Sequence, residues 1–376
     1  MAERMENVSI KVRLRPTKEQ AEHIDKTFGC CRWLWNRILA DEQEFYAATD
    51  QHFLPTPARY KKEAPFLKEA DSQALATVHQ NLRQAFQAFF KNNGAGYPAF
   101  KRKKAGRDAY TIYRPTYSSG KGANLYLTER GIRMPKIGLV EARFHRRPLH
   151  WWTLKSATVS KSPAGNYDCS LTFAYPAKEP EAVLPTEENV LGLQYSISRF
   201  YVDSRGYSPD PPHWLAESQQ KLRRMQKKLA RMERGSGRYQ KQLQKIQRLH
   251  EHIANQRRDF AHKESRRIAN AWGAVCLQEI DLRQAARERK LGSPLESGFG
   301  QFRLMLEYKL RRQGKRLILV DRYFPSAKTC GACGHVEEGL PPEAKTWVCP
   351  ECGTRHIRAV NGAQNIKRQG LAQISA

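Results

Sequence analysis

The sequence lacks any long run of apolar residues. No stretch of the 376-residue chain approaches the roughly 20 consecutive apolar residues that a membrane-spanning helix needs. The first residues also lack the apolar segment of a secretory signal peptide. We therefore expect a cytoplasmic protein with no membrane partner.

Acidic residues are scarce relative to basic ones. Asp and Glu number 37 against 65 Lys and Arg, which gives a formal net charge of +28. A folded chain with this much positive charge repels itself unless a polyanion neutralises it, so nucleic acid is the expected partner. The apolar content of 40% is nevertheless enough to give each of two or three domains its own core.

Cysteine is infrequent except in one region near the C-terminus. Four cysteines lie within apolar patterns and are predicted to be reduced core thiols: Cys30, Cys31, Cys169 and Cys276. The other four form two Cys-x-x-Cys pairs fifteen residues apart: Cys330 with Cys333, and Cys349 with Cys352. This spacing predicts a zinc ribbon rather than two disulfides or four unrelated thiols. Four thiolates would close the coordination of the zinc, so its role is structural.

The N-terminal half is predicted to be a small β-barrel with inserted helices. Alternating apolar residues predict a strand over 8–14. A capping box at Thr17 and Gln20 begins a predicted helix that extends to about residue 48, and Ser72 is expected to cap a second helix. Short strands follow as far as about residue 173, and they complete the barrel around the first strand.

Two features of this half are candidates for nucleic-acid contact. The second helix has a polar face that can read base edges, although a merely solvated face is the alternative. Its candidate residues, with a tyrosine nearby in the sequence, are Ser72, Gln73, Thr77, Gln80 and Tyr60. The glycine-marked loop after residue 94 is suited to gripping a phosphate backbone through Lys101, Arg102, Lys103 and Lys104.

A stretch rich in proline and glutamate, 176–185, marks the clearest domain boundary. Alternating strands and helices after it predict an α/β domain. Within that domain, residues 213–272 form a basic helical tract that a Gly-Ser-Gly sequence breaks into a hairpin. Such a tract is usually a solvated face, but its length and the charge of the whole chain favour a nucleic-acid surface here. Its candidate contacts are Arg223, Arg224, Lys227, Arg257 and Arg258.

Several motifs together resemble TnpB, the RNA-guided nuclease of insertion elements and a relative of type V CRISPR effectors. The motifs are GYPAFK (96–101), LEYK (306–309), FPSAKTCGACG, WVCPECG and NGAQNI, and the resemblance covers nearly the whole chain. It implies a multidomain α+β protein. A wedge β-barrel would comprise 1–15 and 97–178, and a helical recognition domain 16–96. A RuvC-like domain of ribonuclease-H fold would comprise 185–329 and 353–376, with the zinc ribbon inserted at 330–352.

The resemblance also implies a catalytic site that this chain lacks. Nucleases of this fold use three carboxylates to hold two divalent metals. At the matching positions this chain has Gln194, Gln278 and Ala359, where Gln278 is placed by matching 289–291 to an Arg-Lys-Leu of the family. An amide carries no negative charge and alanine offers no ligand, so we expect no catalytic Mg²⁺.

Neighbouring acidic residues are the alternative metal ligands. Glu279 is adjacent to Gln278, but the next residue of a strand points to the opposite face. Asp281 is also near, and Asp203 lies in a predicted turn. No acidic residue follows Glu351, so the third position has no local replacement.

The resemblance is closest to the TnpB-like nuclease-dead repressors. The zinc ligands and the basic surface are retained while the carboxylates are lost, which indicates that binding was kept and cleavage discarded. We expect a guide RNA and a double-stranded DNA target with a short adjacent motif as partners. Binding in the prokaryotic nucleoid would repress transcription by blocking RNA polymerase. Two alternatives stay open: a metal-dependent RNA-guided endonuclease with rearranged ligands, and an RNA-independent transposon accessory protein that binds DNA by charge.

Overall fold

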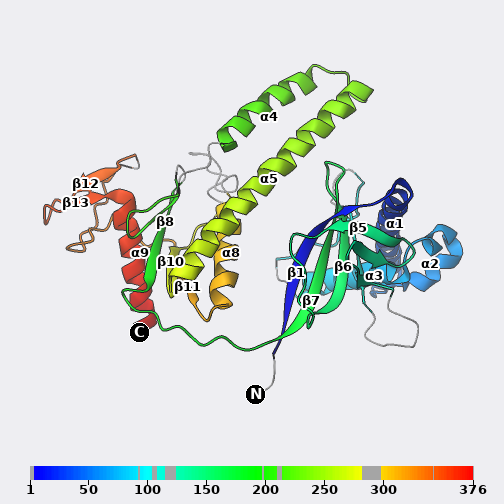
Figure 1. The fold of residues 1–376 in the computed structure, drawn as a ribbon, viewed down its shortest axis with the longest axis horizontal. Coiled ribbons are helices and arrows are strands. Elements are labelled where there is room, and N and C mark those ends of the chain that lie inside the picture. The colour runs from blue at the N-terminus through cyan, green and yellow to red at the C-terminus, as the bar shows by residue number, and fades with distance from the viewer. Residues whose placement is uncertain are drawn as a thin grey trace. The chain divides into compact units, whose positions relative to one another are not determined.

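The computed structural model describes residues 4–91, 94–103, 108–114, 124–196, 199–209, 214–281, 298–341 and 343–375. The candidate contact Lys104 and the matched segment 289–291 lie outside these ranges. The chain divides into two units, Met1–Lys178 and Glu179–Ala376, at the proline-rich stretch (Figure 1). In the described part of the chain, no helix has the length and apolar character needed to cross a membrane.

A seven-stranded antiparallel sheet forms the core of the first unit, in the order β2-β6-β7-β1-β5-β4-β3. Strand β1 (Arg4–Arg15) pairs with β7 (Tyr167–Ala177) on one side and with β5 (Gly138–Arg143) on the other. The other strands are β2 (Ala109–Tyr113), β3 (Tyr126–Leu127), β4 (Gly131–Met134) and β6 (Thr153–Lys161). No ladder among the described residues joins the edge strands β2 and β3, so the expected barrel is a half-barrel.

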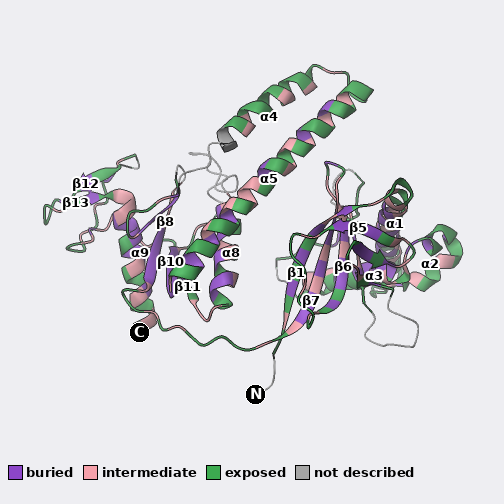
Figure 2. Cartoon of the chain, in the orientation of Figure 1, coloured by how far each residue is buried: buried purple, intermediate pink, exposed green. Residues whose placement is uncertain are grey.

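Helices α1 (Lys18–Thr49), α2 (Pro57–Glu63) and α3 (Ser72–Phe90), with the 3-10 turn η1 (Pro65–Lys68), follow the first strand. Their apolar faces share one core with the sheet, and Figure 2 shows buried residues on both. The capping box of Thr17 and Gln20 begins α1 as predicted. The expected cap at Ser72 is wrong, because Oδ1 of Asp71 accepts from the backbone N–H of Gln73 at 2.9 Å. A carboxylate also interacts favourably with the positive end of the helix dipole.

The second unit is built on a four-stranded mixed sheet in the order β11-β10-β8-β9. Strands β8 (Val190–Ser196), β10 (Ala274–Gln278) and β11 (Arg316–Val320) are parallel, and β9 (Phe200–Asp203) runs antiparallel to β8. A short hairpin of β12 (Thr346–Val348) and β13 (Arg355–Ile357) carries the cysteine region. Together the two units form the multidomain α+β fold that was predicted.

Helices cover both faces of this second sheet. Helices α5 (Gly237–Ala271) and α8 (Phe299–Arg311) share one apolar core with it, and α9 (Arg358–Ser375) shares another. Helix α4 (Trp214–Ala230) pairs with α5 as the predicted hairpin (Figure 1), and Figure 2 shows that α4 and the facing part of α5 are mainly exposed. Glycine is required at residue 192, because a Cβ there would lie 2.0 Å from the carbonyl oxygen of Ala363. Helix α9 therefore packs closely against β8.

Candidate functional site

The α9 side of the second sheet carries two of the three predicted positions. Side chains alternate along β8, so Leu193 packs with α5 and α8 whereas Val190 packs with α9. Gln194 therefore projects on the α9 side. Gln278 ends β10 and follows the same alternation, two residues after Cys276 of the α9 core. The two glutamines thus belong to one face of the sheet, on adjacent parallel strands.

Ser326 links the two glutamines. Its hydroxyl oxygen lies 2.8 Å from Oε1 of Gln278 and 3.2 Å from Oε1 of Gln194. A hydroxyl has one proton, so Ser326 donates to one of these oxygens at a time. Ser326 is only 3% exposed, and a buried hydroxyl needs such a partner. The three side chains form a neutral network in which no group carries a charge.

The amide nitrogen of Gln278 is used as a donor. Its Nε2 lies 2.6 Å from the carbonyl oxygen of Phe324, 3.2 Å from that of Asp321 and 3.3 Å from that of Arg322. An ionised carboxylate has no proton to donate and would face these oxygens unpaired. The glutamine therefore fits this position by its amide, and it ties β10 to the segment that leads into the cysteine region.

Ala359, the third position, lies in the first turn of α9. Gly362 is three residues further on, so the two residues share a helix face. A Cβ at Gly362 would lie 2.9 Å from Oε1 of Gln194, which brings this face of α9 against the glutamine network. The methyl group of Ala359 adds neither a ligand nor a charge there.

The alternative acidic residues have other contacts. Asp203 is 4% exposed, and its Oδ1 accepts from the backbone N–H groups of Arg205 and Tyr207, both at 2.9 Å. It therefore shapes the turn that follows β9. Asp281 lies 4.0 Å from the guanidinium of Arg322. Glu279 is exposed and lies directly after β10, where the alternation directs it away from α9.

The four ribbon cysteines form one cluster. All four sulfurs lie within 4.8 Å of one another, and the Cys330–Cys352 and Cys333–Cys349 pairs are each 3.6 Å apart. Metal–sulfur bonds of about 2.3 Å place tetrahedral thiolates about 3.8 Å apart, so the set fits a single metal ion. Gly334 has φ +83°, and its N–H donates to the carbonyl of Cys330 at 3.0 Å, which closes the first knuckle turn. Because the protein supplies four ligands, the site is structural.

A second group of side chains, which sequence reasoning missed, holds the cysteine cluster in place. Nε2 of His356 lies 3.0 Å from the sulfur of Cys330, and the imidazole is only 9% exposed. Asn361 of α9 accepts from the N–H of Gly331 at 3.0 Å and donates to the carbonyl of Thr329 at 2.7 Å. Asn365, one turn later, donates to the same Thr329 carbonyl at 2.7 Å. Both asparagines belong to the NGAQNI motif, so the sequence revealed the motif but not that its asparagines bind the backbone of the first cysteine knuckle.

The predicted polar face of α3 is only partly available. Ser72 and Gln80 are exposed and Gln73 is half-buried. Thr77 is buried, and its hydroxyl donates to the carbonyl of Gln73 at 2.8 Å. Tyr60 is fully buried and donates to Asp41, so the prediction that it contacts nucleic acid is wrong for this conformation. Its large apolar ring is needed in the core.

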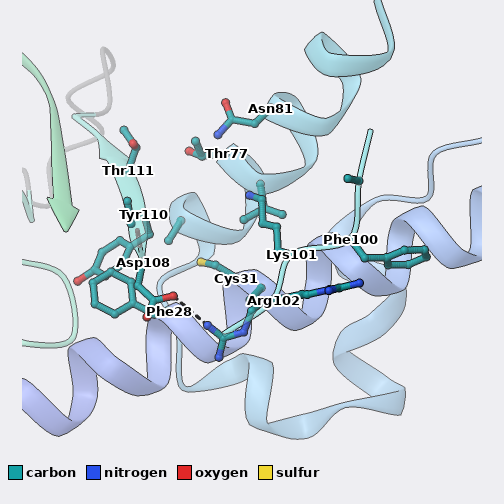
Figure 3. A pocket seen from close by; sticks show the side chains of 15 residues that line it. Phe28, Cys31, Thr77, Asn81, Phe100, Lys101, Arg102, Asp108, Tyr110 and Thr111 are labelled. Atoms are coloured by element: carbon teal, nitrogen blue, oxygen red, sulfur yellow. Dashed lines mark hydrogen bonds and ion pairs between the residues drawn. The ribbon is translucent and has the colours of Figure 1, made fainter. Parts of the chain in front are cut away.

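Three of the predicted contact residues line a pocket of about 520 Å³ in the first unit (Figure 3). Thr77 and Asn81 come from α3, whereas Lys101 and Arg102 come from the glycine-marked loop. The ammonium group of Lys101 lies 3.7 Å from the ring centroid of Trp35, and burial lowers its pKa. Asn81 was not among the predicted residues, although it lies one residue after Gln80.

The remaining basic candidates differ in exposure. Lys103 is exposed in the loop, and three more are exposed on α4: Arg223, Arg224 and Lys227. Arg257 and Arg258 of α5 are half-buried, and Arg258 donates to Oδ1 of Asn255 at 2.7 Å. The α4 arginines and lysine are therefore the more accessible cations of this set, whereas those of α5 are partly engaged.

Comparison with known proteins finds three family profiles and several relatives that resemble this chain. Sequence profiles described as "Probable transposase", "Cas12f1-like, TNB domain" and "Helix-turn-helix domain" match residues 173–289, 299–366 and 5–51. A proposed RNA-guided DNA endonuclease of Streptomyces pristinaespiralis is 29% identical over 97% of this chain and 89% of its own. A second one, InsQ of Escherichia coli strain K12, is 27% identical over 98% of this chain and 93% of its own.

Over nearly its whole length the chain is similar to TnpB-type proteins. Among solved structures, the protein in a cryo-EM structure of a Cas12f1–sgRNA–target DNA complex has the same fold. It gives a TM-score of 0.58 at 12% identity and covers 96% of this chain and 99% of that one. The third profile matches a segment that forms one strand, β1, and one long helix, α1, and not two helices joined by a turn.

Proposed function

We propose that this TnpB-family chain is an RNA-guided, sequence-specific binder of double-stranded DNA that does not cleave its target. Relatives that match almost the whole chain are named as RNA-guided DNA endonucleases, which supports the guide RNA and the DNA target as partners. The net charge of +28 supports binding to both. Bound beside or within a promoter, the complex would repress transcription by obstructing RNA polymerase.

The Gln194–Ser326–Gln278 network carries the proposal that cleavage is absent. A two-metal mechanism needs anionic ligands that offset the charge of Mg²⁺. Here the two amides satisfy a buried hydroxyl and backbone carbonyls, and Ala359 contributes nothing ionic. The side chains are thus occupied in a neutral structural role rather than held ready as metal ligands.

We further propose zinc as the ion of the cysteine cluster. Four thiolates in tetrahedral arrangement suit Zn²⁺ better than oxygen-preferring cations. The ion would hold the two knuckles together and so maintain the ribbon on α9.

The nucleic-acid contacts that we propose are the exposed members of the predicted set, together with the half-buried Gln73. Ser72, Gln73 and Gln80 of α3 are proposed to face the short duplex motif beside the target. Lys101, Arg102 and Lys103 of the loop and the α4 cations are proposed to bind phosphates. The buried Thr77 lines the pocket of the first unit and is not proposed as a contact of the duplex motif.

The test begins with the RNA that copurifies with the tagged protein. Sequencing should give one abundant species with a constant scaffold and a short variable end. Protein loaded with that RNA should then bind matching duplex DNA and lower the output of a reporter that carries the match. Heterogeneous RNA, or no RNA, would contradict the RNA-guided mechanism and would favour the RNA-independent accessory protein.

A metal-dependent endonuclease is the second candidate, because the matching relatives are named endonucleases. Matched duplex DNA incubated with loaded protein and Mg²⁺ or Mn²⁺ should remain uncut and unnicked. The E. coli relative InsQ, handled identically, provides the comparison for the assay. Cleavage by this chain that requires the guide and the metal would establish the second candidate and exclude the first.

A further inference from the structure

The loop between β5 and β6 exposes a tryptophan. The indole of Trp151 is 50% exposed, and the neighbouring Leu149 is 44% exposed. One exposed apolar residue needs no explanation, but a large aromatic ring presented next to a second apolar side chain leaves a flat surface uncovered. None of the predicted contacts and none of the motifs described above includes this loop.

Contacts of Trp152 close this loop and connect it to β7 of the same unit. The N–H of Trp152 donates to the carbonyl of Leu149 at 3.0 Å, which closes a tight turn. The indole of Trp152 stacks on Tyr175 of β7 at 5.4 Å between ring centroids. The ring of His150 meets the exposed indole of Trp151 edge-on, with 4.6 Å between ring centroids.

The sequence segment that carries this indole is basic. No Asp or Glu occurs between Glu141 and Asp168, whereas five Lys or Arg residues do. The guanidinium of Arg146 is exposed and lies 5.0 Å from the ring centroid of Trp152. Arg147 is anchored differently, since its guanidinium donates to the carbonyl of Glu129 at 2.6 Å. An exposed aromatic ring in a basic loop is suited to stacking on nucleotides.

We propose that Trp151 is a stacking platform for an unpaired nucleotide of the guide RNA, with the exposed Arg146 of the same loop for a neighbouring phosphate. The proposal rests on the proposed function, because it takes the guide RNA as a resident partner. Duplex DNA offers its bases only at the cost of unstacking, so an unpaired base suits an exposed indole better. The excess of basic residues in the segment 142–167 disfavours a basic protein partner.

The test measures binding of fluorescent oligouridylate RNA to full-length protein by anisotropy over a range of salt concentrations. Trp151→Ala should weaken binding about 5- to 150-fold, the range that corresponds to 1–3 kcal/mol for a stacked base. Its slope of log affinity against log salt should equal that of the wild type, because stacking releases no counterions. Arg146→Gln should instead make the slope shallower by about 0.7, the value for one phosphate of a single strand.

Two matched substitutions separate stacking from simple apolar contact. Trp151→Phe should retain most of the affinity, whereas Trp151→Leu should lose it although leucine is also apolar. Metal content and thermal unfolding of each variant are compared with those of the wild type, and Trp151→Phe keeps the test decisive if Trp151→Ala folds poorly. Unchanged RNA affinity in a folded Trp151→Ala protein would overturn the proposal.

Other oligonucleotides distinguish the possible occupants. The same substitutions are measured with oligodeoxythymidylate and with duplex DNA. An equal loss on duplex DNA, or a loss on single-stranded DNA without one on RNA, would contradict a guide-RNA platform. The proposed function fails separately, through the absence of a copurifying guide. In that case, an RNA affinity that depends on Trp151 would show that Trp151 binds RNA, but it would not identify that RNA as a guide.

Discussion

A glutamine amide can donate hydrogen bonds, which an ionised carboxylate cannot do. At residue 278 this difference decides what the side chain does, because its Nε2 lies among three backbone carbonyl oxygens. The same amide accepts from Ser326 through Oε1. Both the oxygen and the nitrogen of the Gln278 amide thus have hydrogen-bond partners, and the side chain has a structural role.

Gln278→Glu should therefore destabilise the second unit rather than restore a ligand. The ionised carboxylate of this variant would face carbonyl oxygens and leave buried groups unpaired, which costs about 1–3 kcal/mol. The pKa of the introduced carboxyl would rise in the folded state, so the loss should shrink as the pH falls toward 5. Urea denaturation at pH 7 and pH 5 measures this. Gln278→Met, which adds no charge, is the control, and its stability should show no such pH dependence. If Gln278→Glu is as stable as the wild type at pH 7, the structural role of the amide is refuted.

Lys309 supplies a second test at the level of one residue. Its ammonium is 4% exposed and donates to the carbonyl of His262 at 2.7 Å and to Oγ of Ser265 at 2.6 Å. Desolvation by burial, with a smaller effect of Arg266, lowers its pKa to about 8. The charged form is therefore disfavoured in the folded state relative to the unfolded chain, where the lysine pKa is about 10.4.

The free energy of unfolding contributed by Lys309 should rise as the pH increases from about 8 to about 10.4, because the folded state releases its proton first. Below pH 8 the destabilising effect of the charge is fully present. Lys309→Met should remove this dependence, so its stability advantage over the wild type should shrink with rising pH. Urea denaturation from pH 7 to pH 10 checks this, with the exposed Lys241→Met as control. An unchanged difference across that range would exclude Lys309 as the cause.

At the scale of single residues, the sequence indicated which side chains to examine more readily than which contacts they make. The motifs singled out Gln194 and Gln278 as candidates, but Ser326, which contacts both, is separated from them by 132 and 48 residues. Pairing across such distances depends on the sheet order, which local patterns do not contain. The prediction that Tyr60 contacts nucleic acid was wrong for a related reason, since a tyrosine can lie in a core or on a surface and the local sequence does not decide which.

At the level of elements, α9 joins the ribbon to the sheet. Its face toward the first knuckle carries Asn361 and Asn365, which are 2% and 5% exposed and separated by one helical turn. Their amides share the carbonyl of Thr329, just before Cys330. The metal cluster is therefore positioned by the same helix that packs against β8.

Removing one of these amides should loosen the metal without unfolding the sheet. Asn361→Ala removes the partner of the Gly331 N–H and one of the two donors to the carbonyl of Thr329. Loss of such outer contacts typically weakens metal binding about 10- to 100-fold. Zinc transfer to a colorimetric chelator should accelerate by about that factor. Gln369→Ala, an exposed residue of the same helix, should leave the rate unchanged. Equal rates for the two variants would show that the asparagine does not support the site.

Periodicity predicted the elements themselves well. The strand that became β1, the two halves of the helical tract and the strand–helix alternation after residue 185 all follow from apolar spacing. The order of the half-barrel does not, because β1 pairs with β7 and β5 across more than a hundred residues. The cap of α3 was misplaced by one residue because Asp71 and Ser72 are both good capping residues.

At the scale of the whole molecule, the charge of +28 is the dominant property. Composition alone predicted a polyanionic partner, whereas the choice of an RNA guide depended on motif resemblance. A bound guide RNA would neutralise much of this charge before any DNA is met. The salt dependence of DNA binding should therefore differ between the RNA-free and the RNA-loaded protein.

We expect RNA-free protein to bind duplex DNA with a steep slope of log affinity against log salt and with no sequence preference. A protein that neutralises six to ten phosphates loses about 10³- to 10⁵-fold in affinity between 50 and 200 mM salt. The RNA-loaded protein should show a shallower slope on matched DNA, because base pairing rather than released counterions supplies the affinity. Filter binding over this salt range, with mismatched DNA as control, measures both. Identical slopes and no discrimination by the loaded protein would mean that charge alone holds the DNA, as expected for an accessory protein that needs no guide.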